Sequence, residues 1–245
     1  MTTIETVVKI RRSTDAFKER LHWGWRRLIA FYFFTLLERW LGLHVYRLWV
    51  GGGMVTTWHE QLPKKVPDEY PTRRLEPQDL IPYACEENKL TLAFLTDAQA
   101  RGDSATVVFH EDSIVSYAFR SDSRTPFEHG LELLIPPGFS YGYNAWTHPD
   151  HRRRGLTKYR SKVDWDYQRV NGGPRRGVWY IKFHNYPSLL TDVYEPPHQR
   201  PIYVGLLFVL KIFKRTVYFN SRHVKWFGSV LVRCGEPAYR TYPYT

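Results

Sequence analysis

The residues of this sequence that could do chemistry gather in one stretch, SYGYNAWTHPDHRRRGL, which runs from Ser140 to Leu156. The pattern predicts a strand ending at Trp146-Thr147, a turn with proline, a basic loop with one glycine, and then a helix. The first turn of a helix has unpaired backbone N–H groups and a positive dipole end, so phosphate oxygens bind there. Gly155 permits close backbone approach, and arginines 152–154 can pair with phosphate through two hydrogen bonds. A charge run also fits a solvated surface, but the strand–loop–helix setting favours phosphate binding.

The elements around this loop alternate between strand and helix periodicity. Upstream, ATVVFH and SIVSYAFR predict two strands joined by a turn at Glu111-Asp112. Downstream, apolar residues at spacings of three and four predict a helix from Leu156 to Val170, and GVWYIKF predicts a strand from Gly177 to Phe183. The other expected elements are helices near 77–80 and 89–100 and strands at 131–135 and 140–147.

At these residues the sequence resembles the GNAT acetyltransferase superfamily, over residues 75–195. The family loop reads Arg/Gln-x-x-Gly-x-Gly/Ala after a strand, and here Thr147-His148-Pro149-Asp150-His151 leads into it. Arg152 matches the first loop position, Gly155 matches the central one, and Thr157 stands where the family prefers glycine or alanine. The family's Gly-Phe pair after the last core helix is replaced by Tyr194-Glu195-Pro196-Pro197, so the C-terminal part departs from the pattern.

The resemblance implies an α/β fold with a GNAT-like mixed, mostly antiparallel central sheet, helices on both faces and a V-shaped splay beside the strand ending at Thr147. It implies acetyl-CoA or another acyl-CoA as co-substrate, and no metal. The implied cofactor-binding residues are Arg152, Arg153, Arg154, Gly155, Leu156 and Thr157 at the pyrophosphate, the backbone of Ala145, Trp146 and Thr147 at the thioester, and Asn185 at the pantetheine arm. Asn185 also fits an ordinary turn residue at a strand end.

The activity implied by the resemblance is an enzymatic one, the direct transfer of an acetyl or longer acyl group to an acceptor amine. The amine attacks after losing a proton to a base. Glu132 lies in the strand before the cofactor strand, where family members hold a base, although it also fits an outward residue of an alternating strand. Tyr194 lies two residues beyond the family's tyrosine position and is the candidate acid.

The two ends of the chain are unusually apolar and aromatic. Leu28 to Leu37 is an uncharged run of ten residues, LIAFYFFTLL, and the run YVGLLFVLKIF begins at Tyr203. Both are too short to span a bilayer, for which ~20 apolar residues are needed. We expect residues 16–50 and 203–213 to lie together and hide part of each other's apolar surface. The expected division is an N-terminal helical extension over 1–60, a Pro-rich linker over 61–77 and a GNAT-like acyltransferase domain over 78–245.

Composition narrows the choice of partners. The net charge of +11 favours an acidic partner, which fits acyl-CoA, an acidic acyl carrier protein or an anionic membrane surface. A nucleic-acid partner is not expected, because no recognition motif accompanies the basic residues. Only two cysteines occur, with no zinc spacing, so a cytoplasmic protein is expected, with peripheral membrane binding as a second option. Two other functions stay open: an acyl carrier protein-dependent N-acyltransferase with a lipid-like substrate, and a non-catalytic GNAT-like CoA-binding module.

Overall fold

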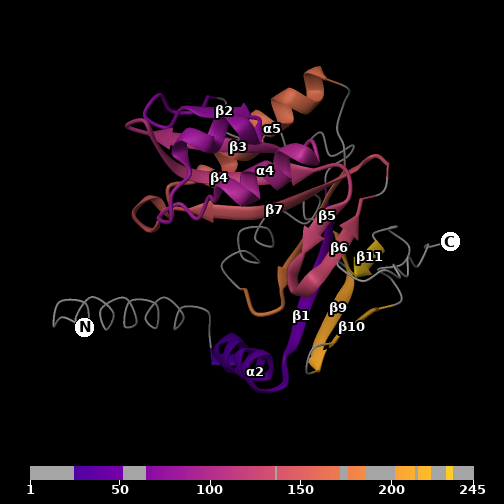
Figure 1. Ribbon diagram of the computed structural model, residues 1–245. Coiled ribbons are helices and arrows are strands. Elements are labelled where there is room, and N and C mark those ends of the chain that lie inside the picture. The colour runs from indigo at the N-terminus through magenta and orange to yellow at the C-terminus, as the bar shows by residue number, and fades with distance from the viewer. Residues whose placement is uncertain are drawn as a thin grey trace.

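The computed structural model describes residues 25–51, 65–135, 137–171, 176–185, 202–212, 215–221 and 230–233 (Figure 1). Most of its strands form one sheet of eight, in the order β10-β9-β1-β8-β7-β4-β3-β2. All neighbouring strands are antiparallel except β7 and β8, which run parallel. The strands are β1 (Leu43–Gly51), β2 (Thr72–Leu75), β3 (Ser104–His110), β4 (Ser113–Ser121), β7 (Phe139–Thr147), β8 (Arg176–Lys182), β9 (Ile202–Ile212) and β10 (Arg215–Asn220).

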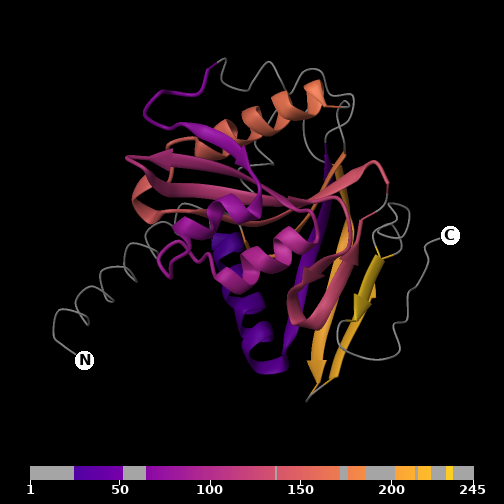
Figure 2. The same ribbon diagram turned by 45° about the horizontal axis from the view of Figure 1, so that its top comes forward.

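Helices cover both faces of one half of this sheet. The α-helices are α2 (Trp25–Leu41), α4 (Leu92–Ala100) and α5 (Leu156–Val170), and the short 3-10 helices are η1 (Pro77–Tyr83), η2 (Glu128–Gly130) and η3 (Pro149–His151). Figure 2 shows the orange α5 on one side of the sheet and the magenta α4 on the other. On β3, Val107 packs with Leu95 of α4, while its neighbour Val108 packs with Leu156 of α5.

Residues 104–109 of β3 are all buried, because alternate side chains of a strand point to opposite faces and helices cover both faces here. The turn at Glu111-Asp112 that joins β3 to β4 has φ of 48° and 62° at its two residues. Such paired positive φ values match the right-handed twist of a two-residue hairpin. The expected fold class, a mixed and mostly antiparallel sheet with helices on both faces, is confirmed.

The N-terminal segment contributes a central strand as well as a helix. β1 pairs with β8 on one side and with β9 on the other, and β2, which falls inside the expected linker, pairs with β3. The large sheet therefore includes one strand from the expected extension, 1–60, and one from the expected linker, 61–77. The division of the chain at 61–77 stays a prediction about folding units, but the sheet is continuous across it.

The expected closeness of the two apolar ends is confirmed for their described parts, although the contact differs from the one predicted. The pairing of β1 with β9, from Leu43↔Leu210 to Val50↔Ile202, brings them together. The apolar run of α2 is not hidden by this pairing, and no residue of α2 is fully buried. Among the described residues, no helix is long and apolar enough to cross a membrane.

The strand expected at 131–135 lies outside the large sheet. β6 (Leu131–Leu134) forms a second, three-stranded sheet with β5 (Thr125–Phe127) and β11 (Val230–Arg233). Its burial alternates as expected, with Leu131 and Leu133 fully buried. Consequently β4 pairs directly with β7 in the large sheet, and Glu132 belongs to the smaller sheet beside it.

Candidate active site

A cleft opens where the two parallel strands part. β7 and β8 pair only from Phe139↔Arg176 to Tyr141↔Val178, and both strands then continue without pairing to each other. The cleft between them encloses about 800 Å³. Gly142 to Thr147 of β7 and Trp179 to Lys182 of β8 form its walls. The predicted splay is therefore present, because β7 diverges from β8 over the residues where divergence was expected.

The diverging part of β7 presents backbone groups to the cleft. Asn144 has a φ of 46°, and the pairing of β7 with β4 shifts register opposite Ala118, which is the geometry of a β-bulge. On the other side, Ser116 donates to the Trp146 carbonyl at 2.9 Å and contacts the Thr147 hydroxyl at 2.8 Å. Because Gly142 to Thr147 have no ladder partner on β8, the backbone of this edge is available to a ligand.

The basic loop after β7 is held in a fixed shape. Arg153 and Gly155 have φ of 65° and 75°, and Gly155 is the N-cap of α5 without a side-chain cap. The Arg154 guanidinium donates to the Tyr70 hydroxyl at 2.7 Å, and Arg152 Nε donates to the Thr147 carbonyl at 3.4 Å. The first turn of α5 thus keeps uncapped N–H groups beside three arginines, as anion binding requires.

The individual loop residues differ in where they lie. Leu156 is buried and packs against Tyr70, so its side chain serves the core rather than the cleft. Arg152, Arg153, Arg154 and Gly155 are exposed and do not belong to the cleft lining, whereas Thr157 does. A Cβ added at Gly155 would meet open space, so the positive φ and not a close neighbour requires glycine there.

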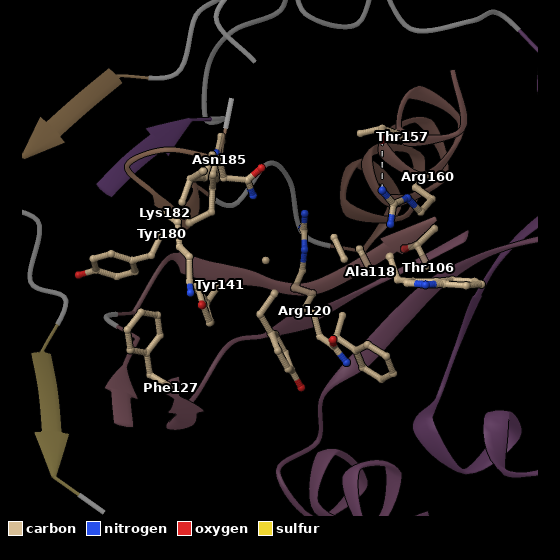
Figure 3. Close-up of a pocket in the computed structure, with 18 of the residues that line it drawn as sticks. Thr106, Ala118, Arg120, Phe127, Tyr141, Thr157, Arg160, Tyr180, Lys182 and Asn185 are labelled. Atoms are coloured by element: carbon tan, nitrogen blue, oxygen red, sulfur yellow. Dashed lines mark hydrogen bonds between the residues drawn. The ribbon is translucent and has the colours of Figure 1, made fainter. Parts of the chain in front are cut away.

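A buried ionic network lies between α5 and the sheet at one end of the cleft. Figure 3 shows Thr157, Arg160 and Thr106 grouped there, with Arg120 between them and Lys182. Arg160 is only 7% exposed and donates to the Tyr117 carbonyl and to Thr157 Oγ1. Burial lowers the pKa of Arg160 to about 10, so it remains a cation at neutral pH.

The same network gives Arg120 a carboxylate that it shares with a second arginine. The Arg120 guanidinium pairs with Asp164 at 2.7 Å, and Arg74 pairs with the same carboxylate at 3.0 Å. Thr106 donates to Asp164 as well, at 3.2 Å. Two arginines on one carboxylate leave a net positive charge in this part of the cleft.

Six titratable side chains meet at the other end of the cleft, and we call them the acid–base cluster. They are Glu38, His44, Tyr46, Glu128, Lys182 and His184. The Tyr46 hydroxyl donates to Glu128 Oε2 at 2.5 Å, and Lys182 Nζ lies 3.6 Å from the same oxygen. Lys182 Nζ also lies 3.5 Å from Glu38 Oε2. Of the six, Tyr46, Glu128 and Lys182 line the cleft.

Two histidines of this cluster lie next to the Glu38 carboxylate. His44 Nδ1 lies 3.6 Å from Glu38 Oε1, and His184 Nε2 lies 4.0 Å from it. Burial lowers the pKa of both histidines, although the Glu38 carboxylate opposes the shift. Burial and the Glu128 carboxylate raise the pKa of Tyr46, so this phenol keeps its proton and remains a donor. The cluster thus combines a half-exposed carboxylate with neutral imidazoles that can accept a proton.

The residues predicted from the sequence are only partly brought together. Ala145, Trp146, Thr147, Thr157 and Asn185 all line the cleft. Tyr194 lies outside the described residues. Among the described residues no group of three or more histidine, cysteine, aspartate or glutamate side chains could hold a metal ion.

Glu132 occupies a different environment from that of a cleft residue. It pairs with Arg124 at the second sheet and is not part of the cleft lining. Two carboxylates line the cleft: Asp164, which is paired with Arg74 and Arg120, and Glu128, in the 3-10 turn before β6. Sequence reasoning missed the acid–base cluster because four separate segments supply it, and the one local signal is the charged Lys182 at the end of an apolar strand.

Comparison with known proteins adds a likeness of fold. No protein-family profile matches the sequence, and no curated protein matches it significantly. Similar solved structures include a GCN5-related N-acetyltransferase from Kribbella flavida, with 14% identity, a TM-score of 0.33, and coverage of 57% of this chain and 50% of that one. A GCN5-related N-acetyltransferase-like protein from Streptococcus suis has 13% identity and a TM-score of 0.41, with coverage of 76% and 67%.

A tandem GNAT protein from the clavulanic acid biosynthesis pathway has 14% identity and a TM-score of 0.46, and the match covers 76% of this chain and 57% of that protein. This chain therefore spans little more than half of the tandem protein and half of the Kribbella protein. In all three structures the sequence identity is 14% or less and the TM-score is below 0.5.

Proposed function

We propose that this chain is an acyltransferase that moves an acetyl or longer acyl group from acyl-CoA to an acceptor amine. The observation that carries the proposal is the cleft between β7 and β8, whose two ends have complementary chemistry. One end adjoins the N-terminus of α5 and its arginines, and the other holds the acid–base cluster. A thioester lying between the strands would have its phosphates at the first end and its acyl group near the second.

The loop after β7 supplies the binding half of the proposed function. Arg152, Arg153 and Arg154 directly precede the uncapped first turn of α5 and are exposed, which suits a pyrophosphate because charge-assisted hydrogen bonds and the helix dipole act together. Thr157 and Asn185 both line the cleft, and Asn185 is the proposed contact of the pantetheine arm. The bulged backbone at Ala145 and Trp146 is the proposed holder of the thioester carbonyl, where N–H donors would stabilise the developing oxyanion.

For the proton transfer we propose Glu128. Its carboxylate lines the cleft and is held by the Tyr46 hydroxyl and the Lys182 ammonium. A base must come within hydrogen-bond reach of the proton that it removes, and an amine bound in the cleft beside Glu128 would place its proton within that reach. The amine nitrogen then forms the new bond to the acyl carbon, the carbon–sulfur bond breaks, and the thiolate takes up a proton. Glu132 and Tyr194 stay predictions from the resemblance.

The test is a thiol-release assay with acetyl-CoA, a long-chain acyl-CoA and a panel of amines. Amine-dependent release of free thiol is the expected result. Binding of acyl-CoA without release across the panel would instead indicate a non-catalytic CoA-binding module. Because the net charge of +11 also suits an acidic acyl carrier protein, acylated carrier protein belongs in the panel as a donor, with lipid-like amines among the acceptors.

A further inference from the structure

Helix α2 presents an unusually apolar surface to its surroundings. Seven of its large hydrophobic side chains are between 42% and 77% exposed. They are Trp25, Ile29, Tyr32, Phe33, Leu36, Trp40 and Leu41. An isolated exposed leucine is ordinary on a protein surface, but a contiguous apolar patch of this kind marks a binding surface.

These side chains form one stripe along the helix. Positions 25, 29, 32, 33, 36 and 40 are separated by steps of three and four residues or lie side by side, so they share a face of about 100° of the helix circumference. The opposite face is occupied by the protein. Phe34 packs against Phe183 with tilted rings whose centroids are 4.4 Å apart, the Phe31 and His184 rings lie 5.5 Å apart, and Glu38 belongs to the acid–base cluster.

The charges beside this stripe all have one sign. The other exposed residues of α2 are Arg26 and Arg39, and its only acidic residue, Glu38, faces inward. At the end of α2, Lys211 donates its backbone N–H to the Gly42 carbonyl at 3.0 Å, and the next residue, Ile212, is an exposed apolar side chain. Lys211 is exposed as well, so the apolar stripe ends among cations.

We propose that the outer face of α2 docks on the surface of an anionic lipid bilayer, with the helix axis in the plane of the membrane. A helix with a full apolar face, arginines beside it and tryptophan at both ends has the composition of an interfacial helix. Arg26, Arg39 and Lys211 would meet anionic headgroups, and each basic residue near such a surface strengthens binding severalfold.

A second copy of this chain fits the same face less well. In a symmetric dimer each stripe would meet an identical stripe, so Arg26 and Arg39 would face arginines again. Glu38 is committed to Lys182 and His44 on the inner face and cannot neutralise them. An anionic lipid surface would supply the negative charge that Arg26 and Arg39 need, so a membrane is the better partner for this face.

The docking places α2 between the membrane and the proposed active site, since Glu38 projects from its inner face into the acid–base cluster. Figure 1 shows α2 at the lower end of the molecule, away from α4 and α5. An acceptor amine in the membrane would therefore lie on the side of the cluster and not on the side of the phosphate-binding loop. The docking itself does not depend on the proposed function.

The experiment is flotation of the full-length chain with vesicles of phosphatidylcholine alone and of phosphatidylcholine mixed with phosphatidylglycerol. We expect binding only to the mixed vesicles, weaker at high salt. The double variant Phe33→Ser/Leu36→Ser should reduce binding at least roughly tenfold, because it removes two apolar side chains from the stripe. Arg26→Gln/Arg39→Gln should reduce it by about tenfold or more as well.

A matched control is Leu92→Ser, which removes an exposed leucine from α4 and should leave binding unchanged. Thermal melting of every variant confirms that each is folded. Absence of binding to the mixed vesicles, or equal binding by the Phe33→Ser/Leu36→Ser variant and the Leu92→Ser control, would overturn the proposal. Sedimentation that showed a dimer dissociating in the double variant, without vesicle binding by the unaltered chain, would assign the face to a second copy instead.

Discussion

Replacing Leu48 tests whether the N-terminal segment belongs to the fold or is attached to it. Leu48 lies in β1, is 0% exposed, and packs in a cluster with Val178 of β8. Truncation to alanine removes buried methyl groups and leaves a cavity, which costs about 2–5 kcal/mol of unfolding free energy. For a chain of this size each kcal/mol shifts the melting temperature by about 2–4 °C, so a fall of about 4–20 °C is expected.

The matched control is Leu36→Ala, the same chemical change in the same segment. Leu36 is 54% exposed on α2, and substitutions at such positions usually change stability by about 0.5 kcal/mol or less. Urea denaturation followed by circular dichroism gives both free energies and shows whether unfolding stays a single transition. If Leu48→Ala melted like Leu36→Ala, or if it lost only a separate minor transition, β1 would not be an integral strand of the large sheet and the reasoning would be refuted.

Three further predictions concern the site. Glu128→Gln should lower kcat by a factor of about 10²–10⁴, because it removes the base and keeps the shape of the side chain. The affinity for CoA, measured by calorimetry, should not change. An unchanged kcat would favour Glu132 as the base instead. Arg152→Gln should weaken CoA binding by about 1–3 kcal/mol, whereas equal affinity would place the phosphates elsewhere. Burial lowers the pKa of His44 and His184 below 6.5, so the unfolded chain binds protons more readily and stability should fall as pH drops from about 7 through 6. His44→Gln should flatten that loss in melting curves, and an equally steep loss in this variant would show that His44 does not cause it.

The parts of the structure that the sequence predicted well are those that local patterns determine. Helix α5 begins at Leu156 and ends at Val170 as expected, because its apolar spacing and the preceding glycine both lie within the segment. The Glu111-Asp112 turn likewise depends on neighbouring residues alone. The position of the basic loop between β7 and α5 follows from the order strand, loop, helix, and that order is local as well.

The parts that could not be predicted depend on distant partners. β1 forms because β8 and β9 offer edges on both sides, and both follow it by more than a hundred residues. Glu38 and Lys182 of the acid–base cluster are likewise more than a hundred residues apart in the sequence. β6 joined the small sheet because β5 and β11 pair with it, and β11 comes from the far end of the chain. A periodicity identifies a strand, but it contains no information about which strand becomes its neighbour.

The two faces of α2 connect these observations. The inner face positions Glu38 beside Lys182, His44 and His184. The outer face exposes apolar side chains to water, which is energetically unfavourable. A helix whose only task was to position Glu38 would gain stability and solubility from polar residues on its outer face. The retained apolar stripe is therefore better explained by a second surface than by packing. Because a rigid helix joins both faces, material bound at the outer face lies within one helix diameter, about 10–12 Å, of the acid–base cluster. That short separation is the physical reason to look for the acceptor amine among molecules held at a membrane surface.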